Sequence, residues 1–79
     1  MATQRLQARY QTANGDVWEE WFVRYDTDEY AEGGYDEVLQ VKKNGRETGH
    51  VTWHYNSSGR LLSRNVHGDA SIPGDAEQI

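Results

Sequence analysis

The sequence lacks cysteine, has no long apolar run, and has few basic residues: 8 Lys and Arg against 13 Asp and Glu in 79 residues. Without cysteine there is no disulfide scaffold, no thiolate nucleophile and no Cys-ligated zinc site. No segment approaches the roughly 20 apolar residues of a membrane-spanning helix. The N-terminal stretch MATQRLQARYQ has no apolar run either, so we expect no signal peptide and no membrane association.

The length sets a second limit. A chain of 79 residues forms one domain at most and buries only about 60–65% of its unfolded surface. Three Trp and five Tyr supply most of the bulk available for a core. We therefore expect one thin core and little else.

Apolar residues alternate with polar ones in most of the chain, which indicates strands rather than helices. The pattern predicts an all-β fold: a five-stranded antiparallel meander that forms a twisted sheet or a partial barrel. The predicted strands cover roughly residues 4–12, 17–26, 36–43, 47–55 and 60–66. We expect residues 1–66 to form the single β domain and residues 67–79, in which Gly and Asp recur on both sides of the single Pro73, to form a mobile C-terminal tail.

Three Gly-containing turns suggest the strand register. Asn14-Gly15 is typical of a two-residue hairpin loop, which would place Leu6 opposite Val23 and Ala8 opposite Trp21. Lys43-Asn44-Gly45 is predicted to be a three-residue loop with a left-handed Gly45, because an odd loop lets Leu39 and Val41 share a face with Val51, Trp53 and Tyr55.

The third turn, Ser57-Ser58-Gly59, has the same three-residue form and would place Tyr55 opposite Leu61. The resulting sheet has one aromatic face and one face with Gln40, Lys42, His50, Thr52 and His54. Trp18 and Phe22 are predicted to lie opposite the main apolar face, where either the tail or a second copy covers them.

Negative charge is concentrated between Asp16 and Glu37, a stretch that contains nine acidic residues and one basic residue, Arg24. This region has a net charge of −8, and the rest of the chain sums to +3. Such a region repels phosphate, so we expect no direct nucleic-acid binding there, and it attracts basic partners.

Metal and enzyme chemistry have weaker support. Asp26, Asp28 and Glu37 match positions 1, 3 and 12 of an EF-hand loop, but Ala31 replaces the turn glycine, so only weak binding of a divalent ion is conceivable. His50 and His54 would lie about 13 Å apart on a strand, too far to share one metal. No serine has a nucleophile motif, and there is no phosphate loop. We predict neither an enzyme nor a cofactor.

The stretch from Tyr55 to Leu61, YNSSGRL, resembles the YD repeat, a Tyr-Asp-x-x-Gly-Arg-Leu unit of bacterial Rhs-type shells, with Asn56 in place of Asp. The resemblance covers seven residues, and the chain holds no second copy. It implies a protein-interaction or structural β module of a phage or bacterial assembly that binds through its aromatic face.

In size, charge and its acidic cluster from Asp16 to Glu37, the chain also resembles the small phage-encoded inhibitors of the anti-CRISPR type. That resemblance implies a non-enzymatic inhibitor, cytoplasmic in a bacterial host, whose carboxylates imitate phosphates and block a basic nucleic-acid-binding site. The expected partner is a basic protein or nucleoprotein complex that handles nucleic acid, and a homodimer is compatible with the unpaired sheet edges. The partner-binding residues in this hypothesis are Glu19, Glu20, Asp26, Asp28, Glu29, Tyr30, Glu32, Tyr35, Asp36 and Glu37.

Overall fold

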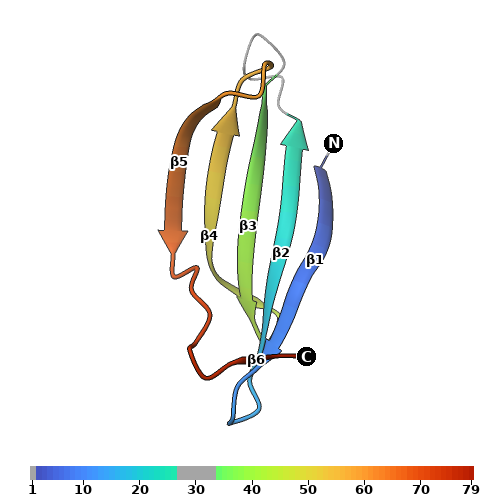
Figure 1. The fold of residues 1–79 in the computed structure, drawn as a ribbon, viewed down its shortest axis with the longest axis vertical. Coiled ribbons are helices and arrows are strands. Elements are labelled where there is room, and N and C mark those ends of the chain that lie inside the picture. Colours follow the sequence, from blue (N-terminus) through green and yellow to red (C-terminus); the bar gives the residue numbers. More distant parts are fainter. Residues whose placement is uncertain (1, 27–33) are drawn as a thin grey trace.

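A computed structural model describes residues 2–26 and 34–79. These residues form one six-stranded antiparallel sheet, as Figure 1 shows. All five predicted strands are present, which confirms the all-β meander, and a short sixth strand is added. The strands are β1 (Ala2–Gln11), β2 (Val17–Asp26), β3 (Tyr35–Lys43), β4 (Arg46–Tyr55), β5 (Leu61–Gly68) and β6 (Glu77–Gln78).

The strand order is β5-β4-β3-β2-β1-β6, so neighbours in sequence are neighbours in the sheet except at β6. The sheet is a single elongated layer, 47 × 20 × 17 Å, and does not close into a barrel. Within the described residues no helix is long and apolar enough to cross a membrane.

The first two hairpins use the opposite loop types from those predicted. Gly15 has φ 92°, its N–H donates to Thr12, and Thr12 pairs with Asp16, so the first loop has three residues. Asn44 and Gly45 both have positive φ, and Lys43 pairs directly with Arg46, so the second loop has two. The predicted loop lengths were therefore wrong at both turns, although each Asn-Gly pair does form a turn.

The two registers change accordingly. Leu6 lies opposite Trp21, not Val23, because an irregularity at Gln7 follows the longer loop. In the second hairpin an extra residue at Thr48 restores the parity, and Leu39 lies opposite Val51. The expected sharing of a face by β3 and β4 is thus correct, and the structure reaches it through a bulge rather than through an odd loop.

The third turn is confirmed. Asn56 donates its N–H to Arg60, Gly59 has φ 83°, and Tyr55 lies opposite Leu61. The Asn56 side chain accepts hydrogen bonds from the backbone N–H groups of Ser58 and Arg60, at 3.1 and 2.9 Å. Asn56 therefore stabilises the turn as the first residue of an Asx-turn.

The β2–β3 register corrects the assignment of faces. Phe22 lies opposite Leu39, and Glu20 lies opposite Val41, so the even-numbered residues of β2 join the apolar residues of β3. The prediction that Trp18 and Phe22 lie on the opposite face was wrong. We call the face that carries them the aromatic face; its members include Trp18, Phe22, Tyr35, Leu39, Val41, Val51, Trp53 and Tyr55.

The other face, here the histidine face, carries all three histidines: His50, His54 and His67. It also carries Trp21 and Val23, which were predicted for the apolar side. Each face has a small core. Val41 and Val51 are buried on the aromatic face, and Val23 and Val38 are buried on the histidine face. A single layer this thin can bury only short side chains at its centre.

The C-terminal segment crosses the aromatic face at the end of the sheet that carries the β1–β2 and β3–β4 loops, as Figure 1 shows. It leaves β5 at Gly68 (φ 67°), and β6 then pairs with the end of β1, where Ile79 donates its N–H to Arg9. The boundary predicted at residue 66 falls inside β5, which extends to Gly68. That the tail is mobile stays a prediction.

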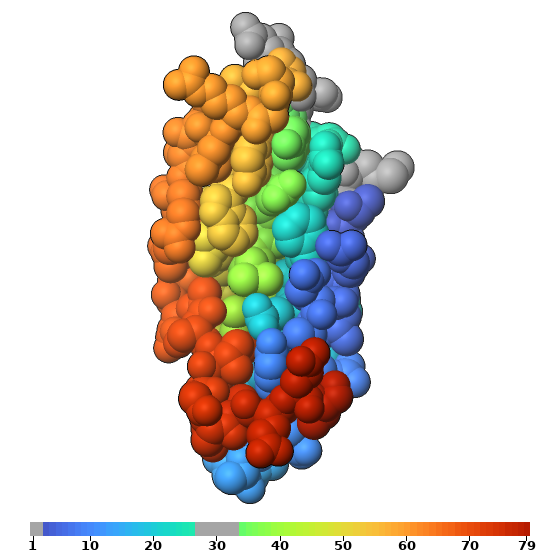
Figure 2. Space-filling view, viewed as in Figure 1, coloured from blue at the N-terminus to red at the C-terminus, as the bar shows by residue number. Residues whose placement is uncertain are grey.

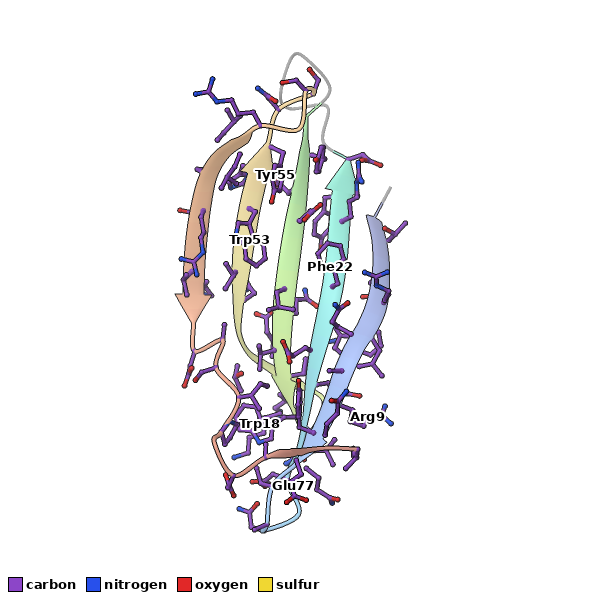
Figure 3. The ribbon with its side chains drawn as sticks, viewed as in Figure 1. Arg9, Trp18, Phe22, Trp53, Tyr55 and Glu77 are labelled. Atoms are coloured by element: carbon purple, nitrogen blue, oxygen red, sulfur yellow. The ribbon has the colours of Figure 1, made fainter. Side chains whose placement is uncertain are left out.

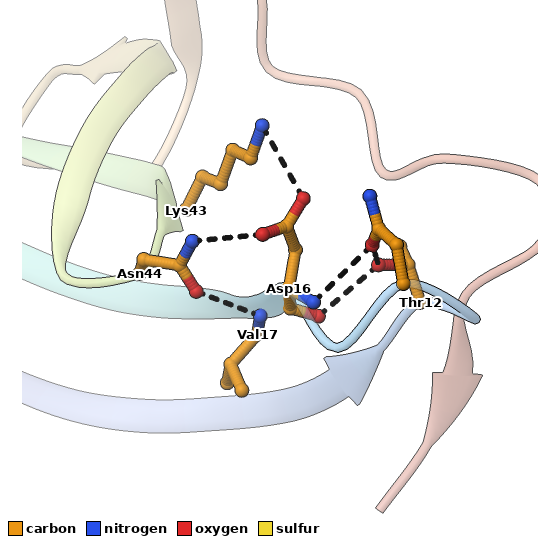
Figure 4. Close-up of polar contacts among 6 residues, drawn as sticks. Thr12, Asp16, Val17, Lys43 and Asn44 are labelled. Carbon is orange, nitrogen blue, oxygen red and sulfur yellow. Dashed lines mark hydrogen bonds and ion pairs between the residues drawn. The ribbon is translucent and has the colours of Figure 1, made fainter.

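A polar network joins the two hairpin loops at that end (Figure 4). The Asn44 side chain accepts a hydrogen bond from the Val17 N–H at 2.9 Å and donates one to the Asp16 carboxylate at 3.1 Å. Lys43 lies 3.5 Å from the same carboxylate. These contacts lower the pKa of Asp16, with the hydrogen bond from Asn44 as the main cause. The network fixes β1–β2 against β3–β4.

Candidate binding faces

The structure divides the predicted acidic site between the two faces of the sheet. Glu19 and Asp36 project from the histidine face, whereas Glu20, Asp26, Tyr35 and Glu37 belong to the aromatic face. Asp28, Glu29, Tyr30 and Glu32 lie outside the described residues. The described carboxylates therefore do not form the single row that the sequence suggested.

Most of these carboxylates already have intramolecular partners. Glu19 accepts two hydrogen bonds from the Arg9 guanidinium, at 2.8 and 3.0 Å, and one from the Trp21 indole at 3.3 Å. The hydrogen bonds from Arg9 hold the pKa of Glu19 below its ordinary value. The hydrogen bond between the Tyr10 hydroxyl and the Glu20 carboxylate raises the pKa of Tyr10, and the negative charge of Glu20 adds to the effect.

Asp36 is engaged on the histidine face. Its carboxylate lies 2.6 Å from Nδ1 of His54, and both side chains are only about one-fifth exposed. The amide nitrogen of Asn65 lies 3.4 Å from Nε2 of the same ring. In this arrangement Nδ1 can donate to the Asp36 carboxylate while Nε2 accepts from the Asn65 amide. The Asp36 carboxylate thus orients the His54 ring.

Asp36, His54 and Ser63 lie in one row across β3, β4 and β5. These residue types suit acyl transfer, in which histidine takes a proton from serine and aspartate orients the ring. Ser63 is exposed on an open sheet surface, however, and a hydrolase also needs oxyanion donors and walls that exclude water. We expect the row to act as a polar network.

The remaining histidines also have partners. The His50 ring stacks on His67 with centroids 5.0 Å apart, and its Nδ1 lies 3.1 Å from the Glu47 carboxylate. A shallow groove of about 280 Å³ runs beside them, lined mainly by Tyr25, Asp36, Val38, Gln40 and His50. Across residues 2–26 and 34–79, no group of three or more His, Asp or Glu side chains is placed to hold a metal ion.

The aromatic face has a covered half and an open half. In the covered half, the backbone of Asp69 packs directly over Gly49, and Val41 is completely buried. Trp18 lies where the C-terminal segment crosses (Figure 3), and its indole N–H is buried without a hydrogen-bond partner in the described part of the chain. Figure 2 shows the C-terminal residues overlying this end of the molecule.

The open half, which the C-terminal segment does not cover, lies toward the other end of the sheet, where Figure 3 labels the half-buried residues Phe22, Trp53 and Tyr55. Tyr35 stacks on Tyr55 with ring centroids 5.0 Å apart. The Arg24 guanidinium lies 4.2 Å from the centroid of Tyr35. A guanidinium of the chain itself therefore already packs against Tyr35, one of the predicted partner-binding residues.

Arginines border the open half on both sides. Arg5 on β1 lies 5.5 Å from the Phe22 ring centroid, and Arg64 on β5 lies opposite Trp53. Asp26, next to Arg24 at 3.5 Å, and Glu37 are the acids of this half. Aromatic and arginine side chains are enriched among the residues that contribute most of the binding energy in protein interfaces.

Sequence reasoning missed this division of the face. The signal that could have indicated it is Gly49, a glycine in the interior of an otherwise regular strand pattern, since such a residue often marks the close approach of another backbone. Comparisons of the chain with family models, with curated proteins and with solved structures find no match. The functional argument therefore rests on the residues themselves.

Proposed function

We propose that the protein is a non-enzymatic binding module that docks an extended segment of a partner protein on the open half of its aromatic face. The observation that carries this proposal is the chain's own tail, which occupies the other half of the same face. The tail passes over Gly49 as irregular backbone and places the half-buried residues Ile72, Pro73 and Ala76 near the sheet.

The tail shows what kind of segment this surface accepts. A partner segment that continued the coverage would lay small or branched apolar side chains on Phe22, Leu39 and Trp53. Acidic side chains in that segment would meet Arg5 and Arg64, the arginines at the two borders. Burial of aromatic side chains would supply most of the affinity, because such rings dominate the energetics of interfaces.

The inhibitor that mimics nucleic acid is the second candidate. The observation in its favour is that Asp26 and Glu37 belong to the open half and flank, in sequence, the acids Asp28, Glu29 and Glu32. In that function the partner is basic and handles nucleic acid, and the carboxylates compete with phosphates. Glu19 and Asp36 support it poorly, since Arg9 and His54 already engage them.

One capture experiment tests both candidates. The tagged protein is immobilised, bacterial lysate is passed over it, and bound proteins are eluted in salt steps from about 0.1 M to 1 M, which shorten the screening length from about 10 Å to about 3 Å. The aromatic-face proposal predicts a partner that stays bound through 1 M salt. That partner must be lost with Trp53→Ser and retained with the matched control Tyr25→Ser, which removes an aromatic ring from the histidine face.

Elution at low salt of a protein that handles nucleic acid, from both variants alike, would instead support the mimic. If Trp53→Ser and Tyr25→Ser lost the partner equally, the aromatic face would not be the binding surface. Circular dichroism of each variant shows whether the fold is intact.

A further inference from the structure

The strand β5 leaves one edge of the sheet unprotected. It stands at one end of the strand order, and in the described part of the chain nothing pairs with its outer side. At the opposite edge of the sheet, β6 pairs with part of β1. All eight of its residues are exposed. Leu61, Leu62 and Val66 are 48%, 54% and 55% exposed, which is unusual for apolar side chains on an ordered strand.

The backbone of β5 is equally available. Asp69 donates its N–H to Thr48 on β4, and inward and outward groups alternate along an antiparallel ladder. Arg64, Val66 and Gly68 therefore direct their N–H and C=O groups away from β4. Natural edge strands are shielded by proline, by charged side chains or by short length, and this eight-residue strand contains no proline and a single Lys or Arg, Arg64.

The surface area of the molecule is also large for its mass. A monomer of 9.1 kDa is expected to expose about 4,900 Å². The protein exposes 5373 Å², an excess of about a tenth. Pairing at the β5 edge would remove part of the apolar surface of Leu61, Leu62 and Val66 from water. These side chains contribute to that excess.

Charge indicates which strand pairs with this edge. The other sheet edge, β1, carries Arg5 and Arg9 and no acidic residue, so β5 against β1 of another molecule would bring cations together. Two copies of β5 related by a two-fold axis at Val66 avoid that conflict. Val66 then lies opposite Val66 of the second copy, and Arg64 lies opposite Gly68, four residues away from the second Arg64.

We propose that β5 is a dimerisation edge: it pairs antiparallel with β5 of a second copy, about a two-fold axis at Val66, to form one continuous sheet. The aromatic faces of the two copies then lie on the same side. This inference is independent of the proposed function, since it uses an edge of the sheet and not the open half.

Mass and substitution test the dimer. Light scattering after size exclusion is expected to give twice 9.1 kDa for the unmodified protein. Val66→Lys places two like charges opposite each other at the axis, and should raise the dissociation constant of the dimer by about tenfold or more. The matched control is Leu61→Lys on the same strand and face, outside the central pairs, which should have a much smaller effect.

Disulfide trapping supplies a second readout. The chain contains no cysteine, so Val66→Cys creates a single thiol that mild oxidation should convert to a cross-linked dimer. Leu6→Cys, exposed near the β1 edge, should not cross-link under the same conditions. A monomer at every soluble concentration would overturn the proposal, and so would a dimer that ignores Val66→Lys and fails to trap Val66→Cys.

Discussion

Gly49 on β4 lies directly beneath the backbone of Asp69, so close that a Cβ atom on Gly49 would overlap the Asp69 carbonyl carbon. The contact is between backbone atoms, which cannot turn aside as a flexible side chain can. It sets the path by which the C-terminal segment crosses the aromatic face. The division of that face into covered and open halves therefore depends on one glycine.

Gly49→Ala is expected to displace the tail. The added methyl group overlaps the Asp69 backbone, so the free energy of unfolding should fall by about 1–3 kcal/mol, and Trp emission should shift to the red as Trp18 becomes solvated. Urea unfolding followed by fluorescence measures both effects. Gly74→Ala is the matched control, because no atom lies within 4 Å of its added Cβ. Equal stabilities of the two variants would show that the tail does not pack on Gly49.

Acid is expected to weaken the fold through Glu19 and Asp16. Both have a lowered pKa in the folded state, caused mainly by Arg9 and by Asn44 respectively. Each therefore contributes stability that is complete above its unfolded pKa and is lost as the pH falls through its folded pKa. The free energy of unfolding should drop between about pH 5 and pH 3.

Glu19→Gln and Asp16→Asn should flatten that dependence on pH. At pH 7 Glu19→Gln should cost about 0.5–1 kcal/mol, the range of a surface ion pair. Urea titrations at a series of pH values measure the slope. If the double variant kept the slope of the unmodified protein, other carboxyl groups would be responsible for the acid sensitivity.

Asn44 is expected to stabilise the fold in two separable ways. Its side chain bridges Val17 and Asp16, and its backbone has φ 50°, a conformation that strains other non-glycine residues. Asn44→Gly removes only the bridge and should cost about 1 kcal/mol. Asn44→Ala adds backbone strain and should cost about 1 kcal/mol more. Thermal unfolding compares the two, and equal losses would mean that the left-handed backbone contributes nothing.

The double substitution Asp28→Lys with Glu29→Lys separates the two candidate functions. Both residues lie outside the described part of the chain. If the aromatic face binds the partner, capture should be unchanged, because the contacts in that proposal come from Phe22, Trp53 and the bordering arginines. The mimic requires the opposite result, complete loss of binding with an intact fold, since these carboxylates would replace phosphates. Capture with each variant in about 0.1 M salt, where surface charge is least screened, gives the comparison.

Sequence periodicity predicts the strands of this protein well, because apolar and polar residues alternate in most of the chain and the three hairpin turns contain glycine. At the Gly59 turn both the loop and the register are predicted correctly. Gly59 has the left-handed backbone that ends a three-residue loop, and the Asn56 side chain accepts from Arg60 across that loop. At the two Asn-Gly pairs the loop types were exchanged. The first loop is closed by side chains that propensity ignores: Thr12 hydrogen-bonds Asn14, and Asn14 accepts from the Asp16 N–H.

The candidate site was less predictable than the fold. Strand β2 has apolar residues on both faces, so its pattern does not reveal whether Trp21 or Phe22 joins Leu39. Eight residues separate β2 from β3 in the sequence, and a connection of that length does not specify a register. The assignment of Glu19, Asp36 and Glu37 to faces depended on that register, and the predicted acidic row was lost with it.

Quenching of two tryptophans tests the central claim, that half of the aromatic face is closed by the tail and half is open for a partner. In single-Trp variants with the other tryptophans replaced by Phe, acrylamide should quench Trp53 efficiently and Trp18 poorly. Gly49→Ala should raise the quenching of Trp18 toward that of Trp53. Equal quenching of Trp18 and Trp53 in the absence of that substitution would contradict the account.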